Sequence, residues 1–190
     1  MSAGNRRLAT LGRGTNHDFV ARRYAALRGL PPEPLAFDTL KECADAVLAG
    51  DAAYAVICSV HPDTPHLLTA YHKRLYLADT FISPSKNLAI VTREQIHRPH
   101  SVGVFTATLG LGDLSAWREI VVEKSGTIFD VETQLRRGAY DSALVYRDFL
   151  DRVPGYRLEM EIDSPDDAWL VLGTVRAFKG EIVASRTALV

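Results

Sequence analysis

The sequence predicts an α/β protein made of two similar lobes with mostly parallel sheets. Short apolar runs alternate with amphipathic segments along most of the chain, which favours right-handed βαβ units. In addition, residues 37–57 have an echo in residues 125–146. Two α/β lobes built alike are expected to leave a crevice between them, where strand carboxyl ends and helix N-termini meet. Such crevices are common ligand sites.

In the first lobe, apolar strands are expected to alternate with helices that end in glycine or proline-rich loops. The predicted elements are strands at 8–11, 35–37, 54–58 and 74–82, helices at 18–27 and 39–50, and a helical turn at 67–71. The run 54–58 is apolar throughout, as is typical of a strand covered on both faces. The first lobe is predicted to span 6–86 and to be completed by about 163–185.

The second lobe is predicted to span 87–162. Its expected elements are strands at 87–92, 101–106, 119–122, 142–146 and 156–162, helices at 114–119 and 125–138, and a helical turn at 148–153. A last strand at 169–175 returns to the first lobe.

The echo rests on matched spacing in a helix and the strand after it. The matching positions are Thr39 and Thr127 before the helix, Gly50 and Gly138 after it, and Ala55 and Ala143 in the strand. Any helix that stops at a glycine before a buried strand would look similar. The equal spacing nevertheless favours two lobes of one design.

Composition excludes several classes of protein. The chain has 190 residues, 47% of them hydrophobic, and a formal net charge of -1. This balance provides no global field for nucleic acid or an anionic membrane, and no apolar run is long enough to span a bilayer. The first residues lack an apolar segment, so no signal peptide is predicted and a cytoplasmic location is expected. The two cysteines, Cys43 and Cys58, are interpreted as buried thiols.

Three loops have the chemistry of an anion site. Backbone N–H groups at helix N-termini bind carboxylates and phosphates, and glycine, hydroxyl and guanidinium groups add to this. The candidate substrate-binding residues are Arg13, Gly14, Thr15, Ser59, Thr106, Thr108, Ser125, Gly126 and Thr127. Each loop alone would fit an ordinary N-cap or turn. Together they predict a shared site, and neither a dinucleotide fingerprint nor a P-loop is present.

The histidines supply the candidate for proton transfer. His61 follows the strand at 54–58 directly, which places it at the expected crevice, and it is the predicted general acid. His17 beside the glycine loop is an alternative, although a role in the helix turn would also explain it. His61, His66 and His72 gather near Asp63, but their spacing matches no standard zinc pattern. No metal and no cofactor are therefore predicted.

Several of these segments resemble the prephenate dehydratase family. Residues 11–15, followed by Ala21, resemble the family's opening Gly-Pro-x-Gly-Thr-Tyr-Ser-x-x-Ala, with one residue absent and the proline lost. Residues 37–57 resemble its apolar unit ending in Asp-Tyr-Ala-Val-Val-Pro, residues 74–91 its crossing strands, and residues 125–145 its second-lobe stretch. The resemblance covers about 8–173. It implies a two-lobed fold of the type II periplasmic-binding-protein kind and a small anionic, dicarboxylate substrate.

Two departures from the family alter the implied reaction. The family's Pro-Ile-Glu-Asn becomes Cys58-Ser59-Val60-His61, and its proton-donating Thr-Arg-Phe would fall near Asp167-Ala168-Trp169. The regulatory ACT domain has no counterpart in the sequence. The chain is thus similar in character to stand-alone prephenate decarboxylases of the bacilysin pathway, which serve antibiotic biosynthesis. The resemblance implies a lyase that decarboxylates prephenate, or a close relative of it, without making an aromatic ring.

Two further interpretations of the function stay open. One is a prephenate dehydratase-like enzyme with an altered substrate. The other is a non-catalytic module that binds a small anion. No nucleic acid or membrane partner is expected, and analogy with this fold class favours a homodimer.

Overall fold

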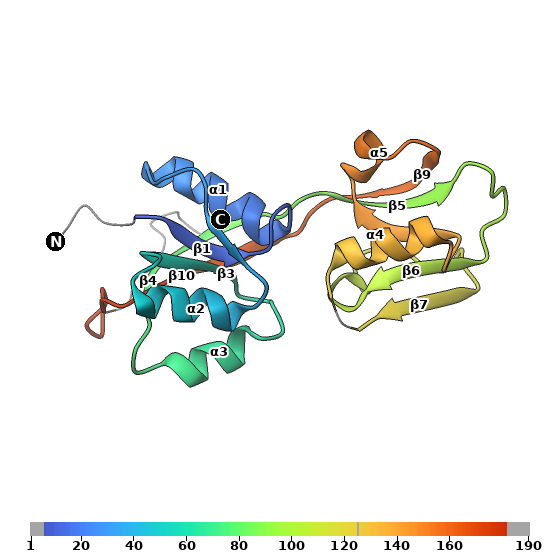
Figure 1. The fold of residues 1–190 in the computed structure, drawn as a ribbon. Helices are drawn as coiled ribbons and strands as arrows, with labels where there is room; N and C mark the ends of the chain where they lie inside the picture. The colour runs from blue at the N-terminus through green and yellow to red at the C-terminus, as the bar shows by residue number, and fades with distance from the viewer. Residues whose placement is uncertain (1–5, 125, 182–190) are drawn as a thin grey trace, which may run out of the picture. The chain divides into compact units, whose positions relative to one another are not determined.

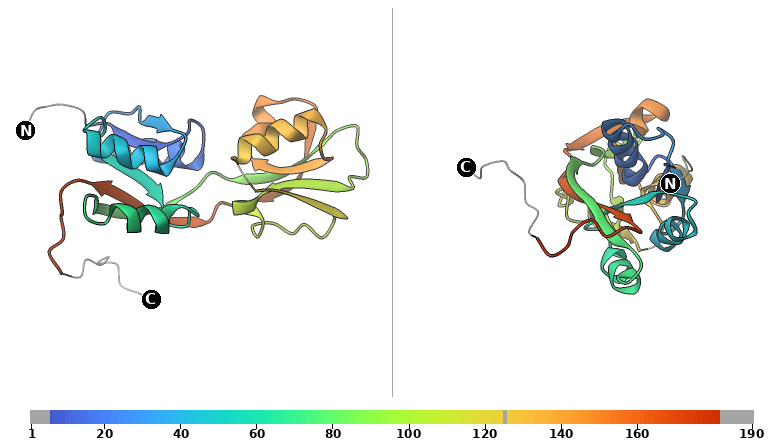
Figure 2. Two further views of the ribbon diagram at one scale, coloured as in Figure 1. Left: turned by 60° about the horizontal axis from the view of Figure 1, so that its bottom comes forward. Right: turned by 90° about the vertical axis from the view of Figure 1, so that its left-hand side faces the viewer.

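The computed structural model describes residues 6–124 and 126–181, and it divides the chain into two compact units. The first unit runs to Ser83 and resumes at Asp167, and the second comprises Pro84–Asp166. The chain therefore leaves the first unit once and returns to it once (Figure 1, Figure 2). These boundaries lie a few residues from those expected at 86/87 and 162/163.

Among the described residues, the first unit contains a five-stranded sheet with the order β2-β1-β3-β10-β4. Its strands are β1 (Leu8–Leu11), β2 (Leu35–Phe37), β3 (Tyr54–Cys58), β4 (Tyr76–Pro84) and β10 (Asp166–Gly173). Its helices are α1 (Asn16–Arg28), α2 (Leu40–Ala49) and α3 (Thr64–Tyr71). β1 runs parallel to β2 and β3, whereas β10 runs antiparallel to β3. The sheet is consequently mixed, with its parallel strands at one side.

Helices cover both faces of this sheet (Figure 1). α1 packs Val20, Ala21 and Tyr24 against one face, where Val56 and Trp169 are buried. The opposite face carries a separate core to which α2 and α3 contribute. β3 is buried on both sides as a result, which explains its unbroken apolar sequence.

The second unit contains a sheet with the order β7-β6-β8-β5-β9. Its strands are β5 (Leu88–Arg93), β6 (Ser101–Phe105), β7 (Glu119–Glu123), β8 (Ser142–Tyr146) and β9 (Tyr156–Ile162). Its helices are η1 (Thr106–Thr108, a 3₁₀ turn), α4 (Ile128–Arg137) and α5 (Phe149–Arg152). β6 runs parallel to β7 and β8, and β5 runs antiparallel to β8 and β9. The parallel part again occupies one side of a mixed sheet.

The echo between the two halves of the sequence is confirmed in structural detail. Thr39 and Thr127 both head capping boxes, at α2 and α4, and both helices end at a left-handed glycine. Ala55 pairs with Ala9 of β1, and Ala143 pairs in the same way with Gly103 of β6. The repeated unit is therefore a helix and the buried central strand that comes after it.

One predicted helix was wrong. Residues 114–119 form a turn that leads into β7, in which the Trp117 N–H donates to the Leu114 carbonyl at 3.1 Å. Asp113 stabilises the start of this turn by accepting the Ser115 N–H at 2.9 Å. Trp117 is buried, and its indole N–H donates to the Ser142 hydroxyl at 2.9 Å. A segment this short gains few helical hydrogen bonds, so anchoring the indole decides its conformation.

Two further expectations concern membranes and thiols. Within residues 6–124 and 126–181, no helix has the length and apolar character needed to cross a membrane. Cys43 and Cys58 are both free and buried. Burial raises the pKa of the Cys58 thiol to about 11, so it is not a nucleophile near neutral pH.

Candidate functional site

In the first unit, the candidate residues gather at one edge of the sheet. β1 and β3 are parallel, so the loop after β1 and the loop after β3 emerge at the same edge. The first of these loops holds Arg13, Gly14 and Thr15, and the second holds Ser59 and His61. We call this the β1/β3 edge.

The glycine loop has a fixed backbone. Gly14 has φ 79°, a conformation that favours glycine. Thr15 caps α1: its hydroxyl donates to the Gly12 carbonyl at 2.7 Å and accepts the Asp18 N–H at 3.3 Å. Arg13 is exposed at the tip of the loop. The loop thus offers one guanidinium on a rigid turn.

The N-terminus of α1 already carries a carboxylate from the chain itself. Asp18 is buried, and its Oδ2 accepts the Gly14 N–H at 2.9 Å. Its Oδ1 accepts from Nε of Arg22 at 3.1 Å. The expected anion donor at Gly14 is therefore occupied from within, and Arg13 is the group here with which a bound anion would interact most strongly.

Two imidazoles meet at the β1/β3 edge. The ring centroids of His17 and His61 lie 5.5 Å apart, with their planes at 84°. His17 also stands edge-on to Trp169, at 5.2 Å between centroids. His17 is buried, whereas His61 is half-buried. Sequence reasoning placed each histidine near the expected site but did not predict their contact.

Backbone hydrogen bonds assign a tautomer to each ring. The Cys58 N–H donates to Nε2 of His17 at 3.2 Å, and the Asp63 N–H donates to Nδ1 of His61 at 3.2 Å. Neutral His17 therefore carries its proton on Nδ1, and neutral His61 carries its proton on Nε2. The Nε2–H of His61 is the proton that a ligand at this edge would meet.

Burial keeps both rings neutral. Desolvation, together with the nearby His61, lowers the pKa of His17 to about 3. Desolvation also lowers the pKa of His61, and the Asp63 carboxylate opposes this only in part. Protonated His61 is thus a stronger acid than free imidazole, but it is a minor species at neutral pH.

Trp169 of β10 packs behind the histidines, on the side of the β1/β3 edge away from solvent. It is fully buried, and its indole N–H donates to the Ser83 carbonyl at 3.0 Å. The Ser59 N–H donates to the Ala168 carbonyl at 3.0 Å, which ties the loop after β3 to β10. An indole thus stands near His17 in the segment where the family resemblance implied Thr-Arg-Phe. No hydroxyl or guanidinium comes from residues 167–169.

In the second unit, hydroxyl groups gather at the carboxyl ends of β6 and β7. Thr106 donates to the Glu123 carbonyl at 3.0 Å and so links the ends of the two strands. Thr108 is buried and donates to the Phe105 carbonyl at 2.9 Å. Both hydroxyls keep acceptor capacity, but their protons are used within the chain.

The start of α4 lies in the connection from β7 to β8. Gly126 has φ 87°, and Asp130 accepts the Thr127 N–H at 2.6 Å and its hydroxyl at 3.1 Å. Ser125 lies outside the described residues. As at α1, a carboxylate of the helix itself occupies the N-terminal donor that was expected to bind an anion.

The remaining histidines of the cluster near Asp63 point to different partners. Nδ1 of His72 contacts the Thr69 carbonyl at 2.8 Å, whereas His66 and Asp63 line the same hollow, together with Tyr71 and Arg74. Among residues 6–124 and 126–181, no three His, Cys, Asp or Glu side chains are grouped to hold a metal ion.

Comparison with known proteins places the fold. No protein-family model and no curated protein matches the sequence. A prephenate dehydratase from Arthrobacter aurescens, solved in complex with L-Phe, is 15% identical, with a TM-score of 0.64 over 93% of this chain and 62% of that chain. A prephenate dehydratase from Staphylococcus aureus is 14% identical, with a TM-score of 0.59 over 90% of this chain and 68% of that one. GqqA, described as a quorum quenching acylase, is 17% identical, with a TM-score of 0.60 over 91% of this chain and 66% of that one.

This likeness shows the fold class. The chain has two α/β units and shares its fold with these prephenate dehydratases. It spans 62% of the length of the Arthrobacter protein. The same fold also carries the activity described for GqqA, so the reaction must be argued from the residues of the site. The crevice expected between the lobes stays a prediction.

Proposed function

We propose that the chain is a lyase that acts on prephenate or a closely related chorismate-derived acid. Its proposed reaction is decarboxylation without aromatisation, a step of natural-product pathways. The observation that carries the proposal is the His17–His61 pair beside the rigid Arg13 loop, at 5.5 Å between ring centroids. Imidazoles next to a cationic loop can bind an anion and move a proton at one edge of a sheet.

The proposed reaction is balanced by one proton. The bond from the ring to its carboxylate breaks, and its electron pair forms a new ring double bond. The neighbouring double bond then takes up a proton at its far carbon, carbon dioxide leaves, and the ring hydroxyl is retained. Aromatisation would instead require an acid that protonates the departing hydroxyl.

The residues of this chain suit the first route better than the second. His61 is the proposed acid through Nε2, because its Nδ1 accepts the Asp63 N–H. Residues 167–169 supply no hydroxyl to protonate a leaving group, since the segment presents Trp169 to His17. Arg13 is proposed to hold a substrate carboxylate, together with Thr15 and Ser59. In the second unit, the proposed contacts are Thr106, Thr108, Ser125, Gly126 and Thr127.

The deciding experiment monitors prephenate by NMR in the presence of the purified protein. Loss of carbon dioxide with formation of a non-aromatic keto acid is the expected result. Rapid formation of phenylpyruvate would keep the substrate and overturn the decarboxylation. Prephenate consumed only at its spontaneous rate would overturn the lyase. Binding without turnover would then favour the anion-binding module, and turnover of another chorismate-pathway acid would favour an altered substrate.

Two variants test the assigned residues. Arg13→Ala is expected to weaken binding of the acid about tenfold, because a charge-assisted contact is lost. Arg136→Ala is the matched control, since it removes the same charge from the exposed C-terminal turn of α4. His61→Ala is expected to lower turnover more than affinity. If Arg13→Ala bound the acid as tightly as Arg136→Ala and the unaltered protein, the β1/β3 edge would not be the site.

The pH profile tests the acid. The pKa of His61 lies below its ordinary value of 6.5, so turnover should increase as the pH falls toward that lowered pKa. The increase should be absent in His61→Ala. A profile that is flat from neutral to mildly acidic pH in the unaltered protein would contradict an acid role for His61.

A further inference from the structure

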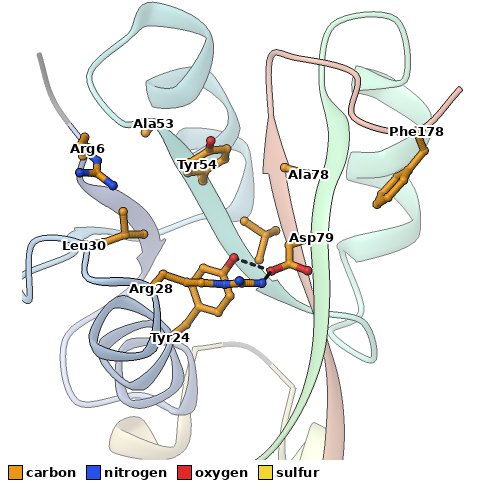
Figure 3. A pocket seen from close by; sticks show the side chains of 10 residues that line it. Arg6, Tyr24, Arg28, Leu30, Ala53, Tyr54, Ala78, Asp79 and Phe178 are labelled. Atoms are coloured by element: carbon orange, nitrogen blue, oxygen red, sulfur yellow. Dashed lines mark hydrogen bonds and ion pairs between the residues drawn. The ribbon is translucent and has the colours of Figure 1, made fainter. Parts of the chain in front are cut away.

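A cavity opens in the first unit, at the edge of the sheet opposite the histidine pair. Figure 3 shows the side chains that line it. Arg6 precedes β1 and Tyr54 begins β3, whereas Arg13 and His61 come after the other ends of the same strands. At about 3.3 Å per residue, these strands separate the two places by roughly 13–16 Å. The cavity has a volume of about 580 Å³, within the range of small-molecule sites. We call it the α1 C-terminal cavity, because Arg28 in the last turn of α1 lines it.

The cavity has an apolar floor and aromatic side chains in its lining. Val171 is almost fully buried beneath it, and Ala78 lies alongside. Tyr54 and Phe178 also line it, and 37% of Tyr54 is exposed. Figure 3 shows these two side chains coming from separate segments, β3 and the stretch after β10. Such a lining suits a flat, apolar ligand body.

The acid in the cavity is already satisfied. Oδ2 of Asp79 accepts from the Tyr24 hydroxyl at 2.8 Å and from the Arg28 guanidinium, and Oδ1 accepts the Thr80 N–H at 2.9 Å (Figure 3). Burial raises the pKa of Tyr24 to about 12, so its phenol stays neutral. Asp79 is therefore neutralised by its partners rather than available to a cationic ligand.

A positive charge remains on the rim. Two arginines and one aspartate line the cavity, which leaves an excess of one positive charge. Arg6 is exposed and forms no ion pair within residues 6–124 and 126–181. The side chain of Arg28 is 51% exposed beyond its contact with Asp79. Each of these exposed guanidiniums can bind a carboxylate.

We propose that the α1 C-terminal cavity binds a small monocarboxylate with a flat, apolar body, separately from the β1/β3 edge. The carboxylate contacts Arg6 on the rim, and the body lies against Tyr54 and Phe178. The site does not depend on the proposed lyase activity, because it shares no residue with the histidine edge.

The test measures binding of phenylacetate and of L-phenylalanine by calorimetry, with acetate as the ligand without an apolar body. Saturable binding at about millimolar concentration or tighter is expected for at least one aromatic acid and not for acetate. Binding of phenylacetate but not of L-phenylalanine would mean that Asp79, which already has its own partners, does not bind the ammonium group of the amino acid. Equal affinity for the two aromatic acids would mean that the site contacts only the carboxylate and the ring.

Variants assign the binding to this cavity. Arg6→Gln and Phe178→Ala are each expected to weaken it about fivefold, by loss of a solvent-exposed charge contact or of an aromatic wall. Lys179→Gln, an exposed neighbour of Phe178, and Arg13→Ala at the β1/β3 edge should leave it unchanged. Absence of saturable binding to the unaltered protein would overturn the proposal. So would binding that survives both cavity variants and is lost in Arg13→Ala.

Discussion

The two units share a helix and a central strand, but they differ in the segment that comes directly after the first strand of the parallel trio. In the first unit, β1 leads into the thirteen-residue helix α1. In the second, β6 leads into a 3₁₀ turn, and residues 109–118 form no helix. Trp117 and Leu114 from this loop cover one face of the second sheet. The corresponding face of the first sheet is covered by α1. One scaffold therefore tolerates either a helix or an anchored loop over the same kind of face.

This difference between helix and loop gives the two units different side chains at the carboxyl ends of their parallel strands. α1 carries His17 in its first turn, and this turn brings the imidazole to His61 at the edge of the sheet. The loop of the second unit brings the hydroxyl groups of Thr106 and Thr108 to the corresponding edge. Proton transfer is thus proposed for the first unit, and binding through hydroxyl groups for the second.

The largest expected effect comes from removing the indole of the first unit. Trp169→Ala should lower the free energy of unfolding by about 3–5 kcal/mol, because a fully buried ring is lost and a cavity remains. Urea unfolding monitored by circular dichroism measures it. Trp117 is then the only tryptophan left, so its fluorescence reports on the second unit alone. Trp169→Phe, which keeps a ring, should cost less; an equal cost for both would contradict a packing role.

The next effect is a pH dependence that belongs to the first unit. The folded-state pKa of His17 is about 3, well below its ordinary 6.5, so the fold favours the neutral ring. Its stabilising contribution is complete above about pH 6.5 and is lost as the pH falls toward 3. At pH 5 the loss should be about 2 kcal/mol.

A matched pair of variants isolates this histidine. His17→Gln keeps an acceptor for the Cys58 N–H but cannot titrate, so its stability should change less between pH 7.5 and 5. His97→Gln, at an exposed position, should retain the full dependence of the unaltered protein. Unfolding in urea at the two pH values measures both. If His17→Gln remained as sensitive to acid as the unaltered protein, burial of His17 would not be the cause.

The smallest effect tests whether the repeated caps are equivalent. Thr39→Ala and Thr127→Ala each remove the hydroxyl of a capping box and should each cost about 1 kcal/mol. Thr39→Ser and Thr127→Ser keep the hydroxyl and serve as controls. Thermal unfolding measures the four proteins. A cost confined to one unit would show that the echo preserves sequence without preserving its energetic role.

Local sequence patterns predicted most of the secondary structure. The limits of β1, β2 and β3 agree with the apolar runs, and the caps of α2 and α4 agree with Thr39, Thr127 and their glycines. These features depend on groups that are a few residues apart, so they can be predicted from the sequence. Residues 114–119 were the exception, because a contact from Trp117 to Ser142 decides their shape.

The candidate site was less accessible to such reasoning. The loop at Arg13 and the position of His61 after a strand could be read from the sequence, since parallel strands bring their carboxyl ends together. That Gly14 and Thr127 already donate to Asp18 and Asp130 could have been suspected from an acid in the first helical turn. Nothing in the local pattern indicated that His17 would be buried against Trp169.

By itself, the sequence determined two α/β lobes, a repeated capped helix and a glycine loop at the end of the first strand. Only the tertiary structure decided that His17, His61 and Trp169, which come from α1, the loop after β3 and β10, form one cluster. Hydrophobic periodicity and capping act over a few residues, whereas the burial that lowers the pKa of His17 needs elements more than a hundred residues apart. Local sequence patterns therefore determine the secondary structure of the scaffold, whereas the environment of the histidines depends on long-range packing.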